Sequence, residues 1–142
     1  MALSFRIIPE RGLVVVEYAG YSTIDELKHT SAAYVAHPDY VAGQKQLVNM
    51  TRITGFEKDY VRFMDLQAAK AERLAGAGVQ SLCVYVAPTP IAQEIASLFT
   101  RTWADISNVV IMIQHTESEA LALLGQPESS IDEMLRATGV EI

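Results

Sequence analysis

Three runs of the chain are apolar without interruption, and they constrain the fold more than any other feature of the sequence. These runs are Leu13–Val16, Leu82–Ala87 and Val109–Ile113. A strand that is apolar on both faces must be covered on both faces, which is typical of central strands between layers of helices. The runs alternate with amphipathic segments, and such strand–helix–strand repeats favour parallel pairing through right-handed crossovers.

The first twenty residues predict a β-hairpin. Leu3–Ile8 and Leu13–Tyr18 are joined by the sequence PERG, in which Gly12 supplies a permissive backbone for the turn and proline interrupts the hydrogen-bond ladder. Ser4 and Arg6 place polar groups on one side of the first strand. We therefore expect this strand at an edge of the sheet.

Helix starts are marked by hydroxyl residues with a glutamate three positions later. In this capping box the hydroxyl and the carboxylate satisfy backbone N–H groups that the helix leaves unpaired. The pattern occurs at Thr23, Thr116 and Ser130, and Thr89-Pro90 places proline at a first helical position. With the apolar runs, these starts predict a single α/β domain over residues 1–142. Its five-stranded mixed sheet consists of the hairpin and the strand–helix repeats that follow, and helices cover it.

Charge and cysteine content narrow the class of protein. The net charge is −6 and the 11 lysines and arginines are scattered, so the sequence does not favour a nucleic-acid partner. The single cysteine, Cys83, excludes an internal disulfide and is typical of a reducing compartment. No run reaches the roughly 20 apolar residues of a membrane helix. These features predict a cytoplasmic protein without a membrane span.

Motifs for catalysis, metals and cofactors are scarce. The three histidines have no metal spacing, one cysteine cannot complete a zinc site, and no phosphate-binding or dinucleotide-binding glycine motif is present. We therefore expect no metal and no cofactor. His37-Pro38-Asp39 would set an imidazole beside a carboxylate, as a catalytic base requires. The same residues fit a helix end followed by a turn, and the lack of a nucleophile motif favours that alternative.

The segment LVNMTRITGF predicts a candidate ligand site. The apolar run is expected to end at Asn49–Arg52, and the carboxyl ends of parallel strands are where α/β proteins bind ligands. The next helix has a wide apolar arc with one polar residue inside it, a combination that orients ligands in mostly apolar pockets. The candidate ligand-binding residues are Asn49, Thr51, Arg52, Phe56, Tyr60, Phe63 and Gln67. Turn and cap roles for the threonine, and backbone bonding by the glutamine, are the alternatives.

The third helix predicts an interface. Its core-facing stripe is expected to be Ile91, Ile95, Leu98, Thr102 and Ile106. Phe99 and Trp103 lie at one margin of this stripe, and aromatic residues are enriched in interface cores. They are candidate interface residues of a homodimer. In the alternative, the helix at Glu119–Leu124 covers them within the same chain.

Four stretches together resemble one family. These are GLVVVEYAGYSTIDEL, HPDYVAGQKQLVNMTRITGF, CVYVAP and NVVIMIQHTESEALALL. They resemble the SpoIIAA-like (STAS-like) domains, small domains of mixed sheet and helices, over nearly the whole chain. The resemblance implies the fold and a binding role, in which the ligand is a partner protein, a nucleotide or an apolar molecule. Fold analogy alone does not fix that ligand.

Two positions depart from the family pattern. Asn49 stands where the strand of such domains often ends in aspartate, so hydrogen bonding is kept while charge is lost. Switch-type antagonists carry a phosphorylatable serine at the start of the following helix, and that position falls within Phe56–Asp59, which contains none. The resemblance therefore does not carry a serine phospho-switch to this chain.

Two main hypotheses of function follow. The first is a non-catalytic STAS-like binding or protein-interaction module of a bacterial regulatory type, without a serine phospho-switch, whose ligand is a protein partner or a small apolar molecule. The alternative is a small enzyme that uses His37 and Asp39 near the strand end at Asn49–Arg52. The absence of catalytic motifs favours the first. A purely structural subunit, with a large contact surface and no cavity, is a third reading.

Overall fold

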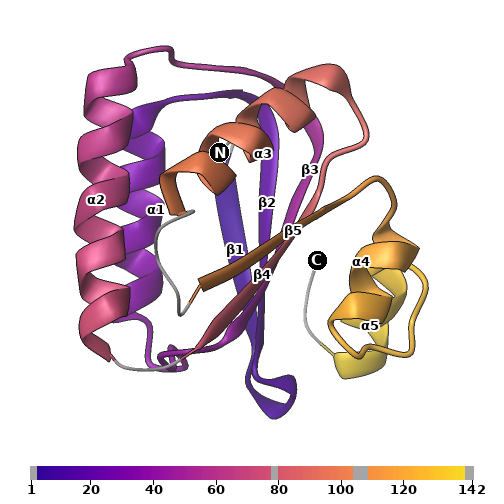
Figure 1. Ribbon diagram of the computed structural model, residues 1–142. Coiled ribbons are helices and arrows are strands. Elements are labelled where there is room, and N and C mark those ends of the chain that lie inside the picture. Colours follow the sequence, from indigo (N-terminus) through magenta and orange to yellow (C-terminus); the bar gives the residue numbers. More distant parts are fainter. Residues whose placement is uncertain (1–2, 78–79, 104–108, 140–142) are drawn as a thin grey trace.

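The protein is described here by a computed structural model that covers residues 3–77, 80–103 and 109–139, without the side chains of 71–77 and 103. Its five strands form one sheet in the order β1-β2-β3-β4-β5 (Figure 1). β1 is antiparallel to β2, and all other neighbours are parallel. The predicted α/β fold with a five-stranded mixed sheet is therefore confirmed. The elements are β1 (Leu3–Ile8), η1 (Pro9–Arg11), β2 (Leu13–Ser22), α1 (Ile24–Ala36), β3 (Lys45–Phe56), α2 (Tyr60–Ala77), β4 (Ser81–Val86), α3 (Pro90–Trp103), β5 (Val109–Gln114), α4 (Glu117–Leu123) and α5 (Ile131–Thr138).

The amino-terminal hairpin is as predicted. β1 and β2 pair from Leu3 opposite Tyr18 to Ile8 opposite Leu13, and a short 3-10 turn connects them. Gly12 closes the turn with φ of 60°, a left-handed conformation that glycine adopts without steric cost. β1 is one edge strand of the sheet, as its polar side predicts. β5 is the other edge strand, so the prediction of a central strand at Val109–Ile113 is wrong.

All four predicted helix starts are confirmed. The hydroxyl oxygens of Thr23, Thr116 and Ser130 accept hydrogen bonds from the backbone N–H three residues later, at 3.1 to 3.2 Å. Thr89 does the same for Ala92 at 3.2 Å. Each bond satisfies one N–H that the first helical turn leaves without an intrahelical partner.

The described helices are amphipathic rather than apolar throughout. α2 is 18 residues long and carries charged residues along its length, among them Arg62, Asp65 and Lys70. None of the helices in the described part of the chain combines the length and apolar character needed to cross a bilayer.

The sheet separates two cores of different composition. α1, α2 and α3 cover one face and α4 and α5 the other (Figure 1). We call the first the aromatic face, with buried Leu3, Tyr18, Ile24, Leu27, Val48, Met50, Ile53, Phe56, Phe63, Cys83, Tyr85, Ala87, Ala92, Ile95, Ala96 and Phe99. We call the second the aliphatic face, with buried Ile8, Leu13, Val15, Leu47, Val84, Val86, Ala120, Leu121, Leu124, Ile131, Met134 and Leu135.

β3 extends beyond its predicted end. The expected strand end at Asn49–Arg52 is wrong, because β3 continues to Phe56 and stays paired with β2, with two register shifts. Pairing with β4, however, stops at Asn49 opposite Val86. Asn49 therefore marks the point where β4 leaves the sheet, and β2 and β3 run on as a two-stranded ribbon.

The core-facing side of α3 differs from the predicted stripe. Ala92, Ile95, Ala96 and Phe99 are buried, whereas Ile91 and Leu98 are only partly so. Two alanines on one side allow the helix to lie close to its neighbours, and this turns Phe99 into the core. Its ring centroid lies 5.1 Å from that of Phe63. The placement of Phe99 on an intermolecular surface is therefore wrong. The side chain of Trp103 and the predicted stripe residue Ile106 lie outside the described part of the structure.

Candidate functional site

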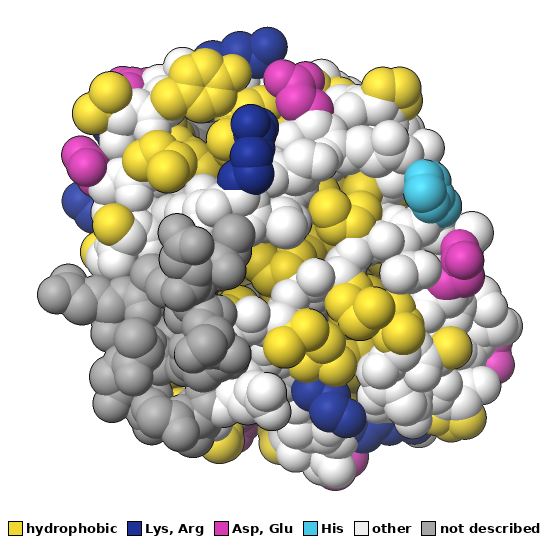
Figure 2. All heavy atoms as spheres, in the orientation of Figure 1, with side chains coloured by type: hydrophobic (Ala, Val, Ile, Leu, Met, Phe, Trp, Pro, Cys, Tyr) yellow, Lys and Arg dark blue, Asp and Glu magenta, His cyan; other side chains and the backbone are white. Residues whose placement is uncertain are grey.

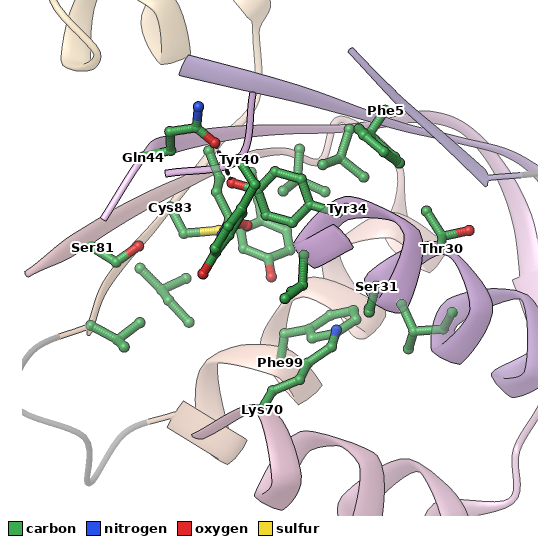
Figure 3. Close-up of a pocket in the computed structure, with 18 of the residues that line it drawn as sticks. Phe5, Thr30, Ser31, Tyr34, Tyr40, Gln44, Lys70, Ser81, Cys83 and Phe99 are labelled. Atoms are coloured by element: carbon green, nitrogen blue, oxygen red, sulfur yellow. Dashed lines mark hydrogen bonds between the residues drawn. The ribbon is translucent and has the colours of Figure 1, made fainter. Parts of the chain in front are cut away.

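A pocket of about 150 Å³ lies on the aromatic face, between the sheet and the helices that cover it (Figure 3). All five strands contribute to it, together with α1, α2, α3 and the loop that precedes β3. Its lining residues are Leu3, Phe5, Val16, Tyr18, Leu27, Thr30, Ser31, Tyr34, Val35, Tyr40, Val41, Gly43, Gln44, Gln46, Val48, Gln67, Lys70, Ser81, Cys83, Tyr85, Phe99, Val109 and Ile111. The lining is mostly apolar with a few polar groups, which is the usual make-up of a small-molecule site.

Strand periodicity explains the floor of this pocket. Side chains of a strand alternate between the two faces, so every second residue of each strand reaches the pocket. On β4 these residues are Ser81, Cys83 and Tyr85, and on β3 they are Gln46 and Val48. Serine and cysteine are small, and at these positions they leave space that a larger aliphatic residue would fill.

The polar groups of the floor are neutral. The Cys83 thiol donates to Gln46 Oε1 at 3.7 Å, and burial raises its pKa to about 12. Burial also raises the pKa values of the Tyr18 and Tyr85 hydroxyls. A thiol acts as a nucleophile only as the thiolate, so Cys83 is protonated and inert at neutral pH. The floor therefore offers hydrogen-bond donors and acceptors without charge.

The rim is held by a short chain of hydrogen bonds between α1 and the following loop. The Tyr34 hydroxyl donates to Gln44 Oε1 at 2.7 Å, and Gln44 Nε2 donates to the Asp39 carbonyl at 2.9 Å. The Tyr40 ring stands edge-on to Tyr34, with centroids 4.9 Å apart (Figure 3). Phe5 of β1 makes a second edge contact with Tyr34 at 5.5 Å. These contacts fix the aromatic wall of the pocket.

Three of the predicted ligand-binding residues lie on the aromatic face. Gln67 is fully buried and lines the pocket. Phe56 and Phe63 are buried and line a second cavity of about 20 Å³ near the start of α1. That cavity has room for about one water molecule and for nothing larger. Of these three, only Gln67 therefore belongs to a space that could hold a ligand.

The remaining four predicted residues line neither cavity. Asn49 Oδ1 accepts from the backbone N–H and the hydroxyl of Thr51, at 3.1 and 2.6 Å. Arg52 pairs with Glu17 at 3.1 Å, and Tyr60 is exposed at the first position of α2. By the alternation of β3, Asn49 points to the same side as Leu47, which belongs to the aliphatic face. The structure thus places Asn49 on the opposite side of the sheet from Gln67.

The catalytic alternative lacks the geometry that it requires. His37 caps the carboxyl end of α1, and its Nδ1 accepts from the backbone N–H of Asp39 at 3.1 Å. The imidazole lies against Phe5, with ring centroids 5.8 Å apart. Neither His37 nor Asp39 lines a described cavity, and their contacts share no residue with those of Asn49 or Arg52. The described residues also contain no cluster of potential metal ligands.

Sequence reasoning missed most residues of the pocket. The tyrosines at 18, 34, 40 and 85 and the glutamines at 44 and 46 come from five separate elements. The sequence of β4 carried a weak signal of the pocket. Ser81, Cys83 and Tyr85 are small or polar, and they occupy every second position in and next to the apolar run Leu82–Ala87. An apolar strand flanked by helices has no need of such residues for packing.

Comparison with known proteins identifies the fold. No family model and no curated protein sequence matches the chain. Among solved structures, the anti-sigma factor antagonist SpoIIAA in its unphosphorylated form is similar over 87% of this chain and 98% of that chain, with a TM-score of 0.51 and 13% identity. At this identity the likeness shows the fold alone. The chain has a SpoIIAA-like (STAS-like) fold, as its sequence predicts.

Proposed function

We propose that the protein is a non-catalytic binding module that takes a small, mainly apolar ligand into the pocket on the aromatic face. One observation carries this proposal. The five buried polar residues among the described ones all line one of the two cavities on that face; they are Ser22, Thr30, Gln44, Gln67 and Ser81. Buried polar groups weaken a core unless they are hydrogen-bonded, so their collection around a space indicates recognition rather than packing.

The space itself supports the same function. Protein interiors are close-packed, and a residual cavity costs about 24 cal/mol for each Å³. A chain that needed only stability would fill a pocket of about 150 Å³ with larger side chains at Ser81 or Cys83. The neutral floor and the inert Cys83 thiol fit a binding site better than a catalytic one.

Native mass spectrometry of freshly purified protein tests the proposal, since it reports bound small molecules and subunit number together. We expect an added small mass that denaturation releases. Val48→Phe, which directs a larger ring into the pocket, should fold and lose this mass, whereas the exposed control Lys58→Met should keep it. A protein that carries no ligand and binds no added aromatic probe would refute the proposal.

A protein-interaction role is the second candidate, and the first turns of α2 favour it. Tyr60, Val61 and Met64 are 48%, 73% and 46% exposed, and Figure 2 shows apolar side chains gathered over the amino-terminal end of α2. Exposed apolar groups in one patch mark interaction sites more often than scattered ones. In the antagonists that the chain resembles, the start of this helix carries the regulatory serine. We call Tyr60, Val61 and Met64 the α2 patch.

The helix start also bears on regulation. Asp59 Oδ1 accepts from the backbone N–H of Arg62 at 3.2 Å, so a carboxylate caps α2 where a serine would be phosphorylated. We propose that this surface works without a phospho-switch. Incubation with serine kinases of the anti-sigma type should leave residues 51–60 unmodified. A phosphopeptide mapped to this segment would contradict the proposal.

A second copy of this chain is a candidate partner for the α2 patch. The Thr102 hydroxyl of α3 contacts Met64 Sδ at 3.6 Å, so the patch adjoins the end of α3 that carries Trp103. We propose a homodimer in which Trp103 and the α2 patch share one surface. Light scattering during gel filtration should give a dimer for the wild type and a monomer for Trp103→Ala. A monomeric wild type at micromolar concentration refutes the dimer, and a folded, dimeric variant refutes this surface.

A further inference from the structure

One exposed side chain borders the pocket. Val41 is 61% exposed, and it is the one exposed residue among the described residues that line the pocket. Other large apolar side chains exposed on the described surface, such as Val61 and Val110, line neither of the two cavities. The Val41 side chain therefore lies at the mouth of the pocket, where water meets the apolar lining.

The loop that carries this valine has a fixed base. We call residues His37–Gln44, between α1 and β3, the rim loop. The buried Gln44 side chain joins the end of this loop to the rest of the rim: its Nε2 donates to the Asp39 carbonyl at 2.9 Å, and its Oε1 accepts from the Tyr34 hydroxyl at 2.7 Å (Figure 3). Asp39 and Gln44 are therefore held together and to α1, and the residues between them form a tip.

This tip, Tyr40–Gly43, has the features of a movable segment. Val41 and Ala42 are exposed, and Gly43 has φ of 87°, a conformation that glycine adopts without steric cost. Short segments of this kind absorb the backbone rotation when a loop closes over a ligand. A movement of the tip would lengthen the 3.1 Å turn hydrogen bond from the Gln44 N–H to the Val41 carbonyl, and burial of the valine would offset that loss.

A bound ligand changes the surroundings of Val41. Burial of an apolar side chain is favourable in proportion to the area removed from water, and an apolar ligand at the mouth gives the valine a surface to cover. We propose that the tip Tyr40–Gly43 is a lid, which moves Val41 from water onto a bound ligand while the base at Asp39 and Gln44 stays in place. The lid then controls how fast the ligand leaves. This inference rests on the proposed ligand-binding function and adds the regulation of the same site.

Hydrogen exchange of the tip amides in the presence of benzyl alcohol tests the closure. This probe suits the pocket, because an engineered cavity of about 150 Å³ in another protein holds benzene and this pocket has about the same volume. With benzyl alcohol at about ten times its Kd, exchange at Val41, Ala42 and Gly43 should slow about tenfold, since only the unbound protein leaves the tip open. Exchange at Lys58, an exposed residue between β3 and α2, should not change.

A matched pair of valine variants tests the contact with the ligand. Val41→Ala removes both γ-methyl groups from the lid and should raise the Kd for benzyl alcohol about fivefold in isothermal titration. Val110→Ala is the control, because Val110 is 40% exposed and points to the side of β5 opposite Val109 and Ile111, which line the pocket. Its Kd should equal that of the wild type. Both substitutions are at exposed positions, so both variants should fold.

The outcomes separate the lid from the ligand site. If benzyl alcohol binds and exchange at the tip is unchanged, the lid is overturned and the proposed pocket function stands. This holds even where Val41→Ala weakens binding, because a fixed wall residue would do the same. Equal Kd values for Val41→Ala and the wild type, or an equal loss in Val110→Ala, would overturn the assigned contact. If the wild type does not bind millimolar benzyl alcohol, both proposals fail.

Discussion

The two faces of one sheet are packed for different purposes. The aliphatic face buries only aliphatic side chains and methionine under α4 and α5, and none of its buried residues lines either cavity. The aromatic face buries tyrosine, phenylalanine, cysteine and glutamine, and the two cavities described above, lined by described residues, lie on it. Both faces are built from the same strands, since adjacent residues point in opposite directions. The chain thus concentrates packing on one side and leaves space and polar groups on the other.

The largest effect is expected from truncation on the aliphatic face. Leu121→Ala should lower the free energy of unfolding by about 3 kcal/mol, because Leu121 is fully buried and its neighbours cannot collapse into the gap. Val16→Ala, at a half-buried position lining the pocket, should lower it by about 1 kcal/mol. Urea unfolding measures both, and equal losses would contradict the difference between the faces.

Enlarging adjacent residues of β3 sharpens the comparison. Leu47→Phe adds volume to a filled core and should cost about 1 to 3 kcal/mol. Val48→Phe adds more volume, but its ring can enter the pocket, so we expect a loss below about 1 kcal/mol. Val48→Phe should therefore be the more stable of the two variants, although it adds the larger volume. If Val48→Phe is the less stable, the pocket is not an open space in solution.

Removing a buried hydroxyl should have a smaller effect of the opposite sign. Thr30 Oγ1 is buried on the aromatic face and has no hydrogen-bond partner among the described residues. Thr30→Val keeps the shape and removes this unsatisfied group, so stability should rise by about 1 kcal/mol. Calorimetry should then show a melting temperature higher by about 2 to 4 °C. A lower melting temperature would show that the hydroxyl is bonded in solution.

The smallest effect is expected at Asn49. In Asn49→Asp a carboxylate oxygen can accept the same two hydrogen bonds from Thr51, at a site that is only partly buried. The free energy of unfolding should change by less than about 0.5 kcal/mol, whereas Asn49→Leu, which lacks the acceptor, should lose about 1 kcal/mol. A loss above about 3 kcal/mol in the aspartate variant would mean that Asn49 lies in a dry interior.

Local signals made the fold predictable. Turns and helix caps form between residues at most four positions apart, so their formation hardly depends on the rest of the chain. This applies to the turn at Gly12 and to the caps at Thr23, Thr116 and Ser130. Continuous apolar strands indicate cover on both faces, which holds for β2 and β4 but not for the edge strand β5, where Val110 and Met112 are exposed. These features led to the five-stranded mixed sheet, and similarity to SpoIIAA confirms the predicted fold.

The site was less predictable because it depends on packing between distant elements. Asn49 lies on β3 and Gln67 on the next helix, α2. The alternation of side chains along β3 nevertheless points Asn49 to the side of the sheet opposite Gln67. The sequence pattern placed Phe99 at the margin of the core-facing side of its helix. In the structure the small alanines at 92 and 96 let the helix lie so that Phe99 points into the core. Lys70 and Cys83 line the same pocket only because α2 and β4 border one space, which no sequence pattern specifies.

Nuclear magnetic resonance of labelled protein titrated with benzyl alcohol tests the central claim most directly. This neutral probe asks whether the aromatic face holds a ligand. We predict shifts of backbone amide signals at Tyr34, Gln44 and Cys83, which line the pocket, and none at Leu121 or Met134 under α4 and α5. Shifts on the aliphatic face, or no shifts at millimolar probe, would contradict the account.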